Sequence, residues 1–325
     1  MNKTAVYRPK WITRFSEDED VSCNDAERSG RPRTSFTKET CHEVEQLIMN
    51  ERRITVSEIA YQCDISIGSA HEIIKSLGFH KLSARWVPRL LTSEMKQKRL
   101  NASHENLKMM NDRNSNFFER LITVDEAWFH QFEIETKGQS KQWCRQGENP
   151  PVKAKQVSSM SKVMVTVFFD HEGVILIDFL DKGQTINSEY YCGLLRRMRE
   201  QLWRKRPGKM RMNPILLQDN SRPHVSNRSL QTIAEIGLQT IKHPPYSPDL
   251  SPCDYFLFPV MKKPLRGRKF SDLDDLKKEI KRWCRNQPTE FYADGLRKLQ
   301  ERYDKCVRLQ GNYVEKCDFN IDFDE

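Results

Sequence analysis

No two cysteines of this chain have the C-x-x-C spacing of a zinc site or a dithiol redox motif, although the sequence contains nine cysteines. It also lacks any apolar run near the ~18 residues that a membrane-spanning helix requires. The first ten residues include two lysines, an arginine and a proline, and they do not resemble a signal peptide. These absences argue against a zinc finger, a disulfide-rich scaffold and a membrane protein. The scattered thiols favour a reducing, intracellular compartment.

The composition is that of a soluble protein with an excess of positive charge. The 325 residues are 37% hydrophobic and 30% charged, and 54 lysines and arginines against 45 acidic residues give a net charge of +9. A chain of this length usually forms two or more domains. Its basic balance is typical of proteins that bind polyanions such as nucleic acids, but an excess of this size is also compatible with a simple contribution to solubility.

A run of basic residues lies at 196–211. It contains Arg204-Lys205-Arg206-Pro207, a pattern that can serve as a nuclear address. The alternative interpretation is a solvated helix face. We expect a nuclear protein, with this run as one candidate signal.

The segment 1–34 is polar and ends in the basic stretch Gly30-Arg31-Pro32-Arg33. Its glycine and proline disfavour a helix and predict an extended linker. An extended arm with arginines fits the narrow minor groove of A·T-rich DNA. A charged interdomain linker is an equally good interpretation of this tetrapeptide. The candidate minor-groove contacts are Arg31, Pro32 and Arg33.

Residues 35–80 have the pattern of three short helices. Thr37 can cap the first helix, Thr55 or Ser57 the second, and Ser66 the third, which Gly78 ends. The tight junction between the second and third helices predicts a helix-turn-helix whose last helix enters the major groove of DNA. A three-helix bundle without DNA contacts is the alternative. The candidate DNA contacts on the last helix are Ser66, Ser69, His71 and Lys75.

Residues 81–118 are predicted to connect two domains. They contain Trp86-Val87-Pro88 and then a basic, asparagine-rich stretch with helical character. The apolar Trp-Val-Pro segment is a candidate docking point for a partner.

Residues 119–314 change to an α/β pattern. Two apolar runs, 163–169 and 174–180, are joined by Asp-His-Glu-Gly and predict a β-hairpin. Helical and strand patterns then alternate, which favours a mixed sheet flanked by helices. The segment 133–161 is unusually long for a connection between strands and predicts a functional protrusion. The acidic tail 315–325 is expected to be disordered.

Three aspartates close or follow short apolar runs, and these are Asp125, Asp219 and Asp254. A carboxylate at the end of a buried strand lies where side chains leave the core. Three such carboxylates can hold two divalent metal ions about 3.5–4 Å apart, an arrangement that catalyses phosphoryl transfer. Oxygen ligands of this kind suit Mg²⁺ or Mn²⁺. Taken singly, each aspartate is equally well interpreted as a turn residue.

The surroundings of these aspartates resemble mariner transposases. Thirty-four residues separate the second and third aspartates, which is the spacing of the family's catalytic triad. The linker motifs Gly30-Arg31-Pro32-Arg33 and Trp86-Val87-Pro88 are also similar to those of the family. The segments that carry the resemblance at the triad are Val124-Asp125-Glu126-Ala127-Trp128, Gln218-Asp219-Asn220-Ser221-Arg222-Pro223-His224 and the run 246–258.

The resemblance implies an α/β RNase H-like catalytic domain, with a mixed sheet flanked by helices, preceded by an all-α helix-turn-helix domain. It also implies a homodimeric transposase that binds terminal inverted repeats of double-stranded DNA, cuts both strands and inserts at TA sites. Asp125, Asp219 and Asp254 would hold two Mg²⁺ or Mn²⁺ ions, which activate the attacking oxygen and stabilise the leaving 3′-oxygen. The loop 133–161 would contact the partner subunit.

Two features depart from the family pattern. The family usually begins with two helix-turn-helix units, and here only Trp11, Arg14 and Phe15 resemble the end of the first. The family most often has histidine before the second aspartate, where this chain has Gln218. The first departure motivates an alternative function: a domesticated, transposase-derived DNA-binding protein without transposition activity.

Several neighbours of the triad have competing interpretations. Arg222 and His224 follow Asp219 closely enough to reach a scissile phosphate. Glu126 should point to the opposite face of its strand from Asp125, which favours a structural role. Asp249 competes with Asp254 as the third ligand, but its place between two prolines favours a turn. We expect His130 and His243 to be ordinary polar residues.

Overall fold

The computed structural model describes residues 36–84, 86–112 and 115–314. Contacts divide the chain into two units, Met1–Arg85 and Trp86–Glu325, and each is described by itself. The linker residues Arg31, Pro32 and Arg33 and the acidic tail 315–325 lie outside the described residues. No helix in the described part of the chain is long and apolar enough to cross a membrane.

The first unit contains the three predicted helices, α2 (Lys38–Asn50), α3 (Val56–Gln62) and α4 (Ile67–Ser76). The side chains of Thr37, Thr55 and Ser66 accept hydrogen bonds from the first turns of these helices. Thr55 and Glu58 form a reciprocal capping box, which satisfies two backbone N–H groups at the start of α3. The core of the unit consists of small and aliphatic side chains, namely Val44, Ile59, Ala60, Ala70 and Ile73.

Helix α4 leaves a polar face uncovered within this unit. The side chains of His71 and Lys75, one turn apart, are exposed. Ser66 and Ser69 also lie at the start of the helix, but their hydroxyl groups are hydrogen-bonded to each other at 2.9 Å. The unit therefore offers His71 and Lys75 as side chains that are free to extend toward a ligand.

The second unit is built on a five-stranded mixed sheet with the strand order β3-β2-β1-β4-β5. The β1–β2 and β2–β3 pairs are antiparallel, whereas β1–β4 and β4–β5 are parallel. This confirms the predicted hairpin and the mixed sheet. The strands are β1 (Leu121–His130), β2 (Lys162–Asp170), β3 (Gly173–Phe179), β4 (Ile215–Leu217) and β5 (Gln239–Thr240).

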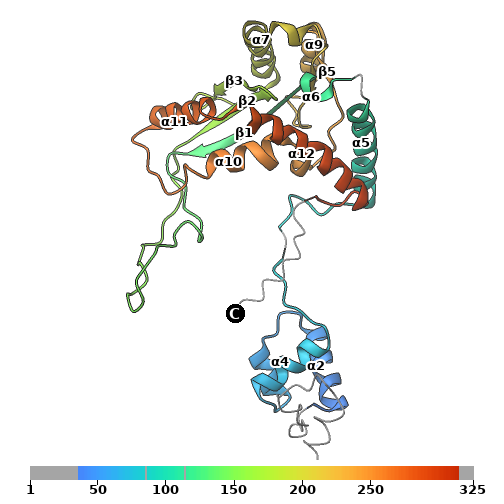
Figure 1. The fold of residues 1–325 in the computed structure, drawn as a ribbon, viewed down its shortest axis with the longest axis vertical. Coiled ribbons are helices and arrows are strands. Elements are labelled where there is room, and N and C mark those ends of the chain that lie inside the picture. Colours follow the sequence, from blue (N-terminus) through green and yellow to red (C-terminus); the bar gives the residue numbers. More distant parts are fainter. Residues whose placement is uncertain (1–35, 85, 113–114, 315–325) are drawn as a thin grey trace, which may run out of the picture. The chain divides into compact units, whose positions relative to one another are not determined.

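Helices cover both faces of the sheet (Figure 1). One face packs against α7 and α9 through a core that includes Ile122 and Val124 of β1. The other face packs against α5, η2, α10, α11 and α12 through a core that includes Leu121 and Phe129. The helices are α5 (Ser93–Asn111), α6 (Phe117–Arg120), α7 (Ser188–Lys205), α8 (Pro207–Met210), α9 (Asn227–Glu235), η1 (Pro248–Leu250), η2 (Cys253–Leu257), α10 (Phe258–Lys262), α11 (Leu273–Arg285) and α12 (Thr289–Arg308).

The segment 81–118, which we expected to connect two domains, contains a helix that belongs to the second unit. Helix α5 lies along α12 and contributes Leu107 and Met110 to the main core. The apolar residues on its inner face were too sparse in sequence to separate a packed helix from a solvated one. The segment 133–161 extends away from the sheet as a long irregular loop (Figure 1).

The second half of the basic run 196–211 makes hydrogen bonds and ion pairs within the fold. Lys205 donates hydrogen bonds to the carbonyl groups of Val174 and Ile175. Lys209 and Arg206 both bind Asp170 at the β2–β3 turn, at 2.6 and 3.1 Å. These side chains hold the hairpin against α7 and α8, and the role of the run as a nuclear address stays a prediction.

Candidate functional site

Asp125 and Asp219 occupy equivalent positions on neighbouring parallel strands. Thr123 of β1 is paired with Leu217 of β4, and each aspartate lies two residues further along the chain. Because side chains alternate along a strand, this offset places both carboxylates on the same face of the sheet, about 4.8 Å apart in strand spacing. The apolar residues before each aspartate form the buried strands that bring the pair together.

Asp254 approaches Asp125 from a different part of the chain. It lies in η2, a single turn of π-helix that follows the Pro-rich segment and packs against β1. Turns of this kind are frequent at functional sites, since the extra residue redirects a side chain. Asp254 lies close enough to Asp125 for its charge to raise the pKa of Asp125. Asp125 also accepts a hydrogen bond from the hydroxyl of Ser251 at 3.2 Å.

The acidity of these carboxyl groups reflects their proximity. Burial, together with the charges of Asp254, Glu126 and Asp219, raises the pKa of Asp125 well above its usual range. Burial and the charge of Asp219 raise the pKa of Asp254 to about 6. Carboxylates that cannot all ionise next to one another are a place where a divalent cation would replace shared protons.

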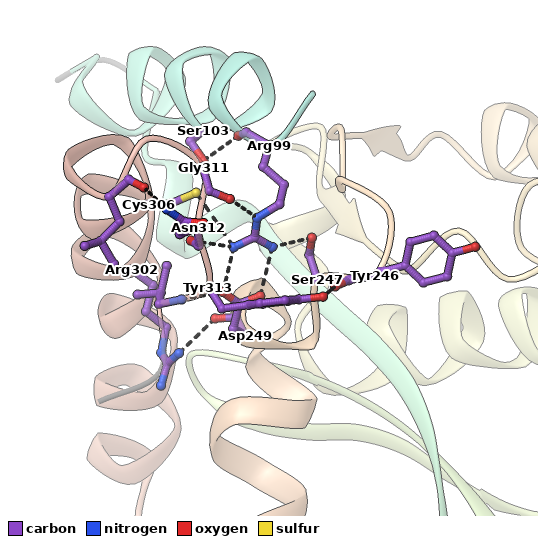
Figure 2. A network of polar contacts seen from close by, with 12 residues as sticks. Arg99, Ser103, Tyr246, Ser247, Asp249, Arg302, Cys306, Gly311, Asn312 and Tyr313 are labelled. Atoms are coloured by element: carbon purple, nitrogen blue, oxygen red, sulfur yellow. Dashed lines mark hydrogen bonds and ion pairs between the residues drawn. The ribbon is translucent and has the colours of Figure 1, made fainter. Parts of the chain in front are cut away.

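Asp249, the competing candidate for the third ligand, is already neutralised. Its two carboxylate oxygens accept hydrogen bonds from Nη1 and Nη2 of Arg99 at 2.9 and 2.7 Å. Both side chains are fully buried, and the backbone N–H of Val314 also donates to Asp249. Figure 2 shows this network, in which Arg99 extends from α5 between the C-terminal segment and the Ser247–Asp249 turn. Asp249 therefore has no oxygen free for a metal.

His224, which we expected at a scissile phosphate, is buried instead, with 1% of its side chain exposed. Its Nδ1 lies 2.6 Å from Oδ1 of Asp219, and its Nε2 lies 3.4 Å from Oε1 of Glu126. The imidazole ring is stacked on Tyr191 of α7 at 4.1 Å between ring centroids. Because both nitrogens face carboxylates, His224 orients Asp219 and has no surface for a DNA phosphate.

The charge on His224 explains why Asp219 differs from the other two aspartates. Although burial acts to raise it, the hydrogen bond and positive charge of His224 lower the pKa of Asp219 to about 2. Burial alone would lower the pKa of His224, but its hydrogen bond to Asp219 and the charges of Glu126 and Asp219 raise it to about 9. At neutral pH the site thus contains an imidazolium between two carboxylates. Glu126, expected to be structural, takes part through this histidine.

Gln218 is hydrogen-bonded to residues around Asp219. Its side-chain oxygen accepts a hydrogen bond from the hydroxyl of Tyr191 at 2.6 Å, and its amide donates to the carbonyl of His224 at 3.1 Å. The glutamine therefore holds the loop that follows Asp219. The sequence showed that this position differs from the family pattern, but the partner, Tyr191, became visible only from the fold.

The other predicted site residues lie at the surface. Arg222 is exposed next to Asp219 and has no ion pair among the described residues, so it can meet a phosphate. Trp86 is 91% exposed, whereas Val87 is half-buried and Pro88 is exposed. His130 contacts the carbonyl of Ser159 at 2.8 Å, a structural role.

A second group of possible ligands lies at the β2–β3 turn. Ligand atoms of Asp170, His171 and Glu172 are within 4.8 Å of one another. However, Asp170 already binds Lys209 and Arg206, so its charge is balanced. Asp125 lies in the middle of β1 and not at its end as the sequence suggested, Asp219 lies two residues after β4, and Asp254 lies in η2. The negative charge of these three aspartates exceeds that of their protein partners, and their oxygen donors fit Mg²⁺ or Mn²⁺.

The sequence of this chain is similar to those of known transposases. A family model described as Transposase (partial DDE domain) matches residues 133–212, between the first and second aspartates. Histone-lysine N-methyltransferase SETMAR of Homo sapiens is 33% identical over 306 residues, which are 94% of this chain and 43% of that protein. The chain therefore spans less than half the length of that relative. Mariner Mos1 transposase of Drosophila mauritiana is 29% identical over 309 residues, covering 94% of this chain and 86% of that protein.

Solved structures of Mos1 agree with the described fold. The Mos1 transposase paired-end complex with left transposon end has a TM-score of 0.76 at 29% identity, over 94% of this chain and 88% of that chain. The paired-end complexes with Mn and with Mg each have a TM-score of 0.76 at 28% identity, over 94% of this chain and 87% of theirs. The crystal structure of the catalytic domain of Mos1 mariner transposase is 30% identical, with a TM-score of 0.59 over 70% of this chain and 99% of that chain. This chain therefore belongs to the mariner family of transposases.

Proposed function

We propose that this protein is a mariner-like DNA transposase that binds terminal inverted repeats and catalyses metal-dependent DNA cleavage and strand transfer into TA sites. The observation that carries this proposal is the meeting of Asp125, Asp219 and Asp254 at one edge of the sheet. A protein that only binds DNA has no use for a buried Asp125 and a neighbouring Asp254 whose pKa values are both raised by burial and by the charge of Asp219.

The three aspartates would hold two Mg²⁺ or Mn²⁺ ions. When bound, such ions supply an activated water or 3′-hydroxyl and stabilise the leaving 3′-oxygen of the phosphodiester. The protein's own contribution is positioning. His224 is hydrogen-bonded to Asp219, Ser251 donates to Asp125, and the exposed Arg222 in the loop after Asp219 would contact the phosphate.

DNA recognition is assigned to the first unit. His71 and Lys75 on the exposed face of α4 are suited to contact the major groove, and Arg31 and Arg33 to contact the minor groove. The Mos1 relative is known as a paired-end complex with transposon-end DNA, which supports a homodimer on two DNA ends here. A DNA substrate supports a nuclear location.

The test is a cleavage assay on DNA that carries the inverted repeats flanking this reading frame. The wild-type chain should nick and cut the repeat ends in Mg²⁺ or Mn²⁺, and Asp219→Asn should reduce the rate by at least about a thousandfold while keeping repeat binding. Asp274→Asn, an exposed aspartate of α11, is the matched control and should cut like the wild type.

Equal cleavage by Asp219→Asn would defeat the assignment of the site. Repeat binding without cleavage by the wild type, in either metal, would favour the alternative of a domesticated DNA-binding protein. The two proposals therefore differ in one measurement on the same samples.

A further inference from the structure

A pocket of about 500 Å³ lies at the C-terminal half of α7, outside the catalytic site. We call it the Trp203 pocket. Its floor contains the indole of Trp203, which is 60% exposed, together with Ile236 at the end of α9. The residues that line it are Arg196, Arg199, Glu200, Trp203, Arg204, Met210 and Ile236.

The lining residues on α7 form one stripe on the helix face that points away from the sheet. Arg196, Arg199 and Trp203 are spaced by three and four residues, which brings them into one line on a helix. The opposite face of α7 is buried in the core through Leu195, Met198 and other side chains. The stripe is therefore not required for packing of the helix on the sheet.

The positive charge of this pocket is not balanced within the described residues. Neighbouring cations of the same run have partners: Arg197 binds Asp178, and Arg206 binds Asp170. Among the described residues Arg196, Arg199 and Arg204 take part in no ion pair. Together with Glu200 they leave the pocket with a net charge of +2 around an exposed tryptophan.

The Trp203 pocket is separate from the catalytic carboxylates. Tyr191, at the other end of α7, is the residue that contacts Gln218 beside Asp219. Trp203 lies twelve residues further along the helix, which corresponds to about 18 Å. A ligand in the pocket is therefore not the phosphodiester at the triad.

The positive charge and the exposed tryptophan of the pocket fit an acidic peptide segment with large apolar side chains. Tryptophan, arginine and methionine are the side chains enriched in the energetic centres of protein interfaces. The phosphate backbone of duplex DNA would satisfy the arginines but has no apolar group to cover the exposed Trp203. An acidic segment with an aromatic anchor satisfies both.

We propose that the Trp203 pocket is a docking site for the segment 318–325 of this chain. Its sequence is Asp-Phe-Asn-Ile-Asp-Phe-Asp-Glu, with four acidic residues interleaved with Phe319, Ile321 and Phe323. The phenylalanine anchors match the apolar floor, and the carboxylates match the unpaired arginines. Three residues separate the segment from Val314, the last described residue, so each copy of the chain carries both halves of the contact.

The experiment uses the full chain with the photoreactive amino acid p-benzoyl-phenylalanine in place of Phe323, irradiated without DNA or divalent metal. Cross-links mapped by mass spectrometry should fall on α7 or α8, at Trp203 or Met210. Trp203→Ala and Arg199→Glu should each reduce their yield by at least about tenfold, as expected for interface anchors. Lys278→Glu, an exposed lysine of α11, makes the same change in charge and should leave the yield unchanged.

Cross-links that fall elsewhere, or that persist in Trp203→Ala and Arg199→Glu, overturn the proposal. A pocket that instead binds a single-stranded oligonucleotide, with loss of binding in Trp203→Ala and no peptide cross-link, is a nucleic-acid site and also overturns it. Because Trp203 and Arg199 are exposed, these variants should keep the wild-type circular dichroism spectrum. The outcome does not depend on cleavage activity, so its failure is distinct from failure of the proposed function.

Discussion

Arg99 of α5 and Asp249 of η1 form an ion pair with both side chains fully buried, joined by two hydrogen bonds of 2.9 and 2.7 Å (Figure 2). The guanidinium also donates to the backbone carbonyl groups of Gly311 and Asn312. This one side chain thus connects α5, the turn five residues before Asp254, and the segment after α12. The pair anchors the segment that leads into η2, which contains Asp254, the proposed third metal ligand.

Replacing Arg99 by methionine should destabilise the second unit strongly. The substitution leaves the Asp249 carboxylate buried without a counter-charge, a defect that typically costs 3–5 kcal/mol. The free energy of unfolding, measured with urea, should fall by about that amount. The matched control is Lys242→Met, which breaks the exposed pair with Glu105 and should cost less than about 1 kcal/mol. Equal losses in the two variants would contradict the central role of Arg99.

Gly295 of α12 should be intolerant of alanine. A methyl group at this position would lie 2.2 Å from a ring carbon of Phe256, two residues after Asp254. The overlap should force Phe256 and its π-helical turn to move, at a cost of about 1–3 kcal/mol, and cleavage should fall with it. Gly193 of α7 has nothing within 4 Å of an added methyl. Gly193→Ala should therefore be neutral or slightly stabilising, since alanine favours a helix. Thermal denaturation of both variants checks this, and a neutral Gly295→Ala would show that η2 adapts.

The shared face of Asp125 and Asp219 could be predicted from the sequence because its determinants are local. The apolar runs before Asp125 and Asp219 predict strands, and the offset of two residues in a parallel pair then sets both carboxylates on one face. The helix caps Thr37, Thr55 and Ser66 were likewise local signals.

Contacts between distant segments could not be predicted in the same way. Arg99 and Asp249 are 150 residues apart, and nothing around Arg99 distinguishes it from the other basic residues of its helix. His224 looked like a residue near the phosphate because it follows Asp219 closely. Its burial depends on Tyr191 and Glu126, which the topology brings from another helix and another strand.

His243 should make the second unit sensitive to acid. Burial lowers the pKa of this histidine from 6.5 to about 4, and its Nδ1 has no hydrogen-bond partner among the described residues. Because this histidine is harder to protonate in the folded state, the unfolded chain binds the proton first. The folded state therefore loses stability as the pH falls from 6.5 through 4. The free energy of unfolding should fall by about 1–3 kcal/mol over this window. His243→Gln should reduce this fall, whereas His104→Gln, an exposed histidine of α5, should not. An unchanged pH profile in His243→Gln would assign the effect to other groups.

Lys75 should contribute charge to DNA binding by the first unit. Removing a lysine that contacts a phosphate weakens binding similarly on all sequences and reduces the slope of log K against log salt by about 1. Lys75→Ala should show this effect on inverted-repeat DNA in fluorescence anisotropy at several salt concentrations. Lys38→Ala, an exposed lysine of α2, is the control. An unchanged slope in Lys75→Ala would move the DNA-contacting face away from α4.

His224 should control metal binding through the orientation of Asp219. It lies 2.6 Å from Asp219 and is itself held by Glu126 and the ring of Tyr191, so the aspartate meets an ion in one fixed rotamer. Residues that orient a metal ligand typically change metal affinity by 10–100-fold when they are replaced. His224→Gln should therefore weaken Mn²⁺ binding by about that factor, seen as a smaller thermal shift at a given Mn²⁺ concentration without DNA. His130→Gln, at a histidine whose ring contacts the backbone carbonyl of Ser159, should bind Mn²⁺ like the wild type. If His224→Gln binds Mn²⁺ with wild-type affinity yet fails to cut DNA, the histidine acts on the reacting groups and not on the metal ligand.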